Sequence, residues 1–165
     1  VYQSFILESK NWGDFVIAKS FMIYAILSVA TLFISGPLVD KFTSRKILPL
    51  MNIPSLFAMI ILFYFDSYIS SYFLLGLMGI SNGLANVLGS STWAEIYGVK
   101  FIGSIKALTT AMMVFSTAFG TAIFGIIIDF GYSIEVIALT SATYIIIANI
   151  LIIIFKGKIE PILIK

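Results

Sequence analysis

Five long apolar runs without a charged residue constrain this chain more than any other feature of its sequence. They cover residues 20–39, 47–65, 69–92, 107–128 and 136–155. A helix needs about 20 apolar residues to cross roughly 30 Å of hydrocarbon, so each run is long enough to span a bilayer. Because an open sheet would leave unpaired backbone groups in lipid, the runs are expected to be helices. The sequence predicts an all-α membrane protein, a bundle of about five transmembrane helices.

The composition argues against a soluble domain and against most enzyme chemistry. Only 11% of the residues are charged, whereas a soluble domain carries roughly 25%. The chain has neither cysteine nor histidine, so it has no thiol chemistry and lacks the commonest metal ligand and proton-transfer side chain. We therefore expect no metal site, no cofactor and no enzymatic activity.

The basic residues lie mainly on alternate links between the runs. Eight of the ten lysines and arginines fall in one set of links, and the other set holds two and most of the acids. The larger set is Lys41, Arg45, Lys46, Lys100, Lys106, Lys156, Lys158 and Lys165. Because basic links stay on the cytoplasmic side, we expect the N-terminal end outside and the C-terminal tail in the cytoplasm. The plasma (inner) membrane is the expected location.

Polar residues inside the runs gather on helix faces. Asn82 and Asn86 share a face of the third run, Tyr24 lies on a hydroxyl-rich face of the first, and Thr117 lies on one of the fourth. For single hydroxyls we favour helix packing, but two carboxamides in one membrane helix are costly unless satisfied. The asparagines either line a polar cavity or form hydrogen bonds to a neighbouring helix, and the sequence leaves both interpretations open. The second and fifth runs are plainer, which predicts three inner helices and two peripheral ones.

The link after the first run carries the most specific motif of the chain. A glycine ends the span, an acid follows four residues later, and basic residues complete a tight turn. These residues are Gly36, Asp40, Lys41, Arg45 and Lys46. The pattern resembles the loop signature of the major facilitator superfamily of secondary transporters, with Thr43 where that family usually has glycine. The resemblance implies that this loop locks one conformation of a transport cycle.

A second link, residues 93–106, resembles the family's corresponding link two helices later. In that arrangement Glu95 is expected to lie close enough to pair with Arg45 or Lys46. Such a pair could act as a gate at the cytoplasmic mouth. A simple interfacial salt bridge, worth little where solvent reaches it, is an equally open interpretation.

The resemblance also implies where this chain belongs in a larger protein. The superfamily has two six-helix halves, so residues 1–7 would end the seventh helix and the five runs would be the eighth to twelfth. Residues 1–165 would then form the C-terminal half, without the N-terminal half and most of the seventh helix. The expected partners are the lipid bilayer, that missing half and a small-molecule substrate, and no nucleic acid.

The preferred function is secondary active or facilitative transport of a small solute by alternating access. Candidate cavity residues are Asn82, Asn86, Tyr24 and Thr117. No charged residue lies in mid-span, so a coupling carboxylate would lie in the missing half, or the protein would be a facilitator. A non-transporting scaffold or assembly subunit is the alternative, and a membrane enzyme using Glu95 or Asp129 ranks third.

Overall fold

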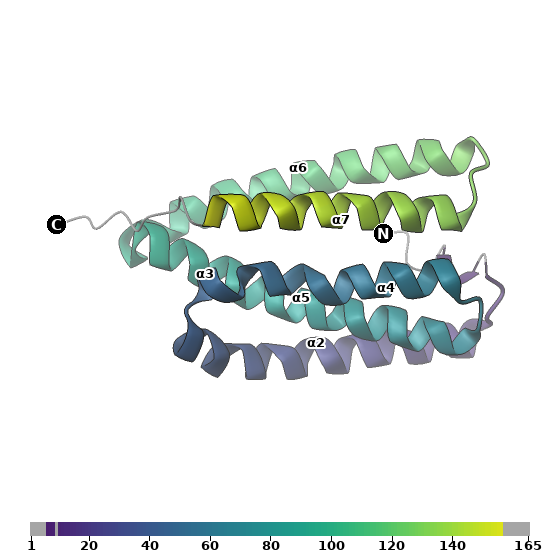
Figure 1. Ribbon diagram of the computed structural model, residues 1–165, viewed down its shortest axis with the longest axis horizontal. Helices are drawn as coiled ribbons and strands as arrows, with labels where there is room; N and C mark the ends of the chain where they lie inside the picture. Colours follow the sequence, from purple (N-terminus) through teal and green to yellow (C-terminus); the bar gives the residue numbers. More distant parts are fainter. Residues whose placement is uncertain (1–5, 9, 157–165) are drawn as a thin grey trace.

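All the regular structure in residues 6–8 and 10–156, the part of the chain that the computed structural model describes, is helical (Figure 1). The elements are α2 (Asp14–Phe42), α3 (Ser44–Ile47), η1 (Leu48–Asn52), α4 (Ile53–Tyr64), α5 (Tyr68–Tyr97), η2 (Val99–Phe101), α6 (Ile102–Asp129) and α7 (Ile134–Lys156). Of the helix end predicted in residues 1–7, residues 6 and 7 are helical and residues 1–5 lie outside the described part.

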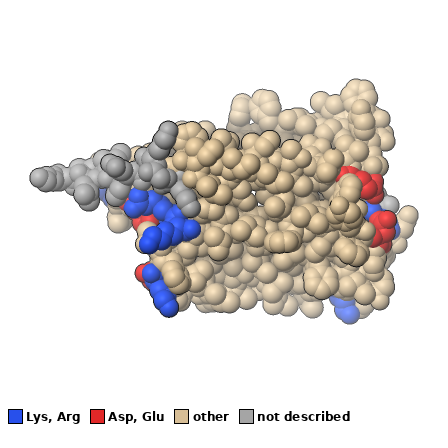
Figure 2. Space-filling model, in the orientation of Figure 1, with Lys and Arg blue, Asp and Glu red and all other residues tan. Residues whose placement is uncertain are grey.

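Five helical stretches are long and apolar enough to cross a membrane. They are Asp14–Phe42, Ser44–Tyr64, Tyr68–Tyr97, Val99–Asp129 and Ile134–Phe155. Each overlaps one predicted run over most of its length, so the prediction of an all-α bundle with five transmembrane helices is confirmed. Figure 2 shows the charged side chains at the two ends of the long axis, with an uncharged band between them. The chain is an integral, multi-pass membrane protein.

Small residues join α2 and α5 along their length. The buried residues of α2 are Ser20, Ser28 and Ser35, whereas Phe33 is 78% exposed. This inside-out pattern is typical of a helix in lipid, where small side chains face a neighbouring helix and large apolar ones face the hydrocarbon. On the α5 side, a Cβ added to Gly79 would lie 2.5 Å from the Tyr24 carbonyl oxygen. The two helix backbones therefore meet almost directly.

An apolar cluster joins α4, α5 and α7 near one end of the bundle. Its fully buried members include Leu7, Leu62, Leu75 and Ala138. The helices α4 and α7, expected at the periphery, thus pack against each other, and α4 also packs against α5. By contrast α6, expected among the inner helices, buries none of its residues against the rest of the described chain.

The second predicted run is helical but broken. It consists of α3, the 3₁₀ segment η1 and α4, and a proline occupies the second position of both η1 and α4. Proline has no backbone N–H, and its ring clashes with the carbonyl four residues earlier. Pro49 and Pro54 therefore prevent one continuous α-helix over this span.

Candidate functional site

The motif of residues 36–46 lies mostly on a helix rather than in a loop. Because α2 continues to Phe42, the residues Gly36, Asp40 and Lys41 occupy its last turns, and the link shrinks to Thr43. A Cβ added to Gly36 would meet nothing within 4 Å in the described chain. The side chains of Asp40 and Lys41 are exposed, and Lys41 at the helix C-terminus interacts favourably with the helix dipole.

The backbone of Thr43 explains why glycine suits this position of the motif. Thr43 has φ 71° and ψ 134°, a conformation that glycine adopts freely. A β-branched residue there is an outlier and costs on the order of 1–3 kcal/mol. The turn therefore has a backbone conformation that favours glycine, with strain at the threonine that occupies it.

Thr43→Gly is expected to raise the free energy of unfolding by about 1 kcal/mol, because relief of strain outweighs the extra flexibility of the unfolded chain. Thermal unfolding of the purified protein in detergent measures the change. Thr43→Ala is the matched control, because it removes the same hydroxyl but keeps a Cβ at positive φ. Equal melting temperatures for the two variants would contradict the assignment of strain.

Glu95, near the end of α5, holds the turn that follows α2. Its Oε1 accepts the backbone N–H of Ser44 at 2.9 Å, and its Oε2 lies 3.7 Å from Arg45 Nε. The Thr92 hydroxyl donates to Ser44 Oγ at 3.0 Å, and both residues are buried. The predicted pair thus forms with Arg45, while Lys46 is exposed. We call these four residues (Ser44, Arg45, Thr92 and Glu95) the Glu95 cluster.

The two asparagines of α5 lie on an uncovered face of the helix. Asn82 Nδ2 donates to Ser28 Oγ of α2 at 3.2 Å, and Asn86 Nδ2 donates to the Asn82 carbonyl at 2.9 Å. Both side chains are nevertheless exposed in the described chain. Asn82 therefore contributes to the contact between α2 and α5, whereas the hydrogen bond of Asn86 stays within its own helix.

The structure brings only some of the four cavity candidates together. Tyr24 adjoins the seam between α2 and α5, because its carbonyl faces Gly79, one turn before Asn82. Thr117 is exposed on α6 and donates to the Met113 carbonyl at 2.8 Å. Thr117 lines a different space, a cavity of about 310 Å³ whose lining includes Ile6, Met59, Leu62, Met78 and Ile137 but neither asparagine.

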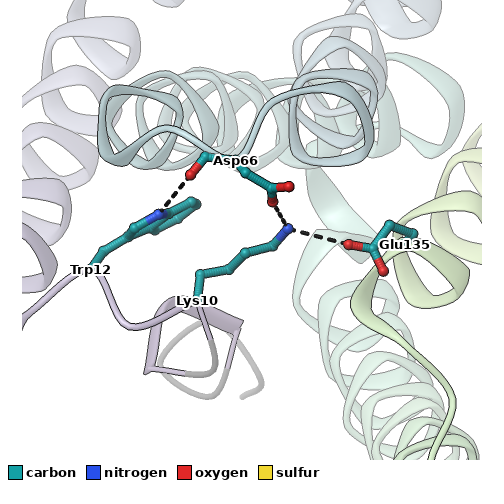
Figure 3. A network of polar contacts seen from close by, with 4 residues as sticks. All are labelled: Lys10, Trp12, Asp66 and Glu135. Carbon is teal, nitrogen blue, oxygen red and sulfur yellow. Dashed lines mark hydrogen bonds and ion pairs between the residues drawn. The ribbon is translucent and has the colours of Figure 1, made fainter.

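A polar network at the opposite end of the bundle was not predicted from the sequence (Figure 3). Lys10 Nζ pairs with Asp66, in the link between α4 and α5, and lies 3.3 Å from Oε1 of Glu135, in the first turn of α7. Trp12 Nε1 donates to the Asp66 carbonyl at 3.0 Å. We call these residues the Lys10 network. The available signal was Lys10 itself, a basic residue in the acid-rich set of links.

The Lys10 side chain is only 11% exposed, yet it remains a cation. Burial alone would lower the pKa of Lys10, but hydrogen bonds to Asp66 and Glu135 and the attraction of their charges outweigh it. The net effect raises the pKa above its ordinary value of 10.5. The positive charge of Lys10 is therefore lost only as pH rises through the raised pKa, which sets the alkaline limit of both ion pairs.

Comparison with known proteins identifies the family. Among the described residues, no group of histidines, cysteines or acids could hold a metal ion. No curated protein and no solved structure matches the chain. Residues 1–161 match the family described as Major Facilitator Superfamily, in agreement with the helical fold and the five spans. The chain therefore belongs to the major facilitator superfamily of membrane transporters.

Proposed function

We propose that this chain forms the C-terminal half of a transporter that moves a small solute by alternating access between two halves. Family membership supports membrane transport, and the finer claim rests on the uncovered face of α5. A non-transporting scaffold gains no support from the family.

The exposed asparagines carry the proposal. The helix α5 is the most extensively buried of the five spans, yet it leaves Asn82 and Asn86 uncovered in mid-span. A carboxamide facing hydrocarbon would leave donors and acceptors unsatisfied, at a cost of several kcal/mol. This face must therefore adjoin something polar. A water-filled cavity shared with the other half provides these polar surroundings. Asn82, Asn86 and Tyr24 lie on the wall of the cavity that this half forms.

The exposure of α6 supports a partner half. Large side chains such as Met113, Phe115 and Phe119 are more than half exposed on it. A cavity of about 640 Å³ separates α6 from α4, α5 and α7. The neighbouring cavity is lined by Ile6, at the start of the described chain. We propose that α6 packs against the N-terminal half, with Thr117 lining that contact.

The Glu95 cluster is proposed as part of the conformational gate. It connects the motif after α2 to the end of α5 through one amide hydrogen bond and one ion pair. The bias of basic residues to this end of the bundle supports a cytoplasmic position for the Glu95 cluster. The Lys10 network then lies at the outer end of the bundle, and the proposed membrane is the plasma membrane. The mid-spans offer no charged group, so any coupling carboxylate would belong to the other half.

Asn82→Ala and Asn86→Ala test the cavity. With the full-length transporter in proteoliposomes, a panel of labelled sugars, carboxylates and organic cations identifies a solute that enters in a saturable manner. Each substitution is then expected to raise the KM for that solute about tenfold, because it removes one hydrogen bond to the substrate. Thr143→Ala, an exposed polar residue on α7, is the control and is expected to leave KM unchanged. Wild-type KM values in both asparagine variants would refute the site.

A further inference from the structure

The break in the second span lies beside a residue of another helix. Ser81 of α5 is 7% exposed, and its hydroxyl reaches the junction between η1 and α4. The backbone N–H of Ser55 donates to Ser81 Oγ at 3.1 Å, and Ser81 Oγ donates to the Met51 carbonyl at 2.5 Å. In a continuous α-helix the Ser55 N–H would donate directly to the Met51 carbonyl, four residues earlier. The hydroxyl therefore stands between the donor and the acceptor of one backbone hydrogen bond.

The inserted hydroxyl gives hydrogen-bond partners to backbone groups that the bend would otherwise leave unpaired. A side chain that inserts into the hydrogen-bond ladder is one of the recognised causes of a sharp helix bend. Direct N–H to carbonyl bonds tolerate little change in angle, whereas a hydroxyl can rotate and bridge the two groups over a range of bends. Asn52, the last residue of η1, also bonds to another helix, since its Nδ2 donates to Asn149 Oδ1 of α7 at 3.3 Å.

The segment beyond the break carries part of the proposed gate. Ser44–Asn52, formed by α3 and η1, holds Ser44 and Arg45, and both contact Glu95. At its other side this segment joins α4, which packs against α5 and α7. The segment Ser44–Asn52 itself contacts α5 and α7, so a change of bend at the junction would shift these contacts and move the gate residues relative to α4.

We propose that the junction between η1 and α4 is a hinge, with Ser81 as the positioning residue that satisfies the backbone as the bend changes. The inference rests on the proposed alternating access. As the Glu95 cluster forms and breaks, the segment Ser44–Asn52 moves relative to α4. Pro49 and Pro54 keep the junction from closing into a straight helix.

Pro54→Ala tests the hinge because it restores an N–H that can bond to the Leu50 carbonyl and removes the ring clash. The variant is expected to straighten the span, to melt at a higher temperature than the wild type, and to transport about tenfold more slowly. A tolerated irregularity without a hinge role would give higher stability with unchanged transport.

Spin labels measure the bend without any substrate. Leu50→Cys and Tyr64→Cys place labels on exposed sites on either side of the junction, in a chain that has no cysteine of its own. In full-length protein freed of other cysteines, double electron–electron resonance is expected to give two label distances, merging into one after Pro54→Ala. One narrow distance in both proteins would overturn the hinge. Two distances without uptake of any solute would count against the proposed transport alone.

Ser81→Ala separates positioning from ordinary packing. Ser71→Ala is its matched control, because Ser71 is also buried on α5 and bonds a neighbouring helix, with its Oγ 2.9 Å from Ser20 Oγ. Both variants are expected to lose similar stability, but only Ser81→Ala should change the distribution of label distances. Identical distributions in the two variants would overturn the role of Ser81.

Discussion

Gly79→Ala is expected to lower the free energy of unfolding by about 3 kcal/mol, at the upper end of the range for overpacking. The added Cβ would lie 2.5 Å from the Tyr24 carbonyl oxygen and 3.2 Å from the Tyr24 Cα. Both are backbone atoms, so no side-chain rotation can relieve the contact and α2 has to move away from α5. That movement also separates Asn82 from Ser28, one turn further along the seam.

Gly89→Ala is the matched control for this prediction. Gly89 belongs to the same helix, and a Cβ added there would meet nothing within 4 Å. Because alanine favours helix more than glycine does, this variant is expected to match or exceed the wild-type stability. Thermal unfolding of the purified protein in detergent compares the two. If the two variants have the same melting temperature, the close backbone contact is not what stabilises the packing of α2 against α5.

The span count was predictable because a membrane imposes length and apolarity on every crossing segment. The break in the second span was only partly predictable. Pro49 and Pro54 are visible in the sequence, but the residue that satisfies the broken backbone, Ser81, lies 26 positions beyond Ser55 on another helix. The helical periodicity of the sequence places Ser81 on one face of α5, but it does not identify the helix that packs against that face.

The contact between Glu95 and Arg45 was predictable because the motif constrains the geometry of the links. Tight links bring the start of the second span beside the end of the third, which is why Glu95 was expected near Arg45 or Lys46. The choice between the two basic residues was not predictable, and the structure pairs Glu95 with Arg45 and leaves Lys46 exposed. The packing of α4 and α7 was missed, because plain apolar runs carry no polar stripe to mark the helices they contact.

A second large effect is expected from removing both acids of the Lys10 network. The double variant Asp66→Asn and Glu135→Gln should lose about 2 kcal/mol of unfolding free energy, because it leaves the Lys10 charge with little solvent and no counter-charge. The estimate is below the range for fully buried pairs, since both carboxylates are partly or largely exposed. Thermal unfolding at pH 7 measures the loss.

Adding Lys10→Met to that double variant is expected to restore most of the lost stability. The triple variant removes the unpaired charge and keeps a flexible apolar side chain that can pack beside Trp12. Lys10→Met alone should cost little, because Asp66 and Glu135 can then be solvated. This asymmetry between removing the cation and removing the acids distinguishes desolvation from simple ion-pair attraction. If Lys10→Met alone costs as much as the double variant, attraction between the charges is the main contribution, and the Lys10 network stabilises its end of the bundle as an ordinary salt bridge would.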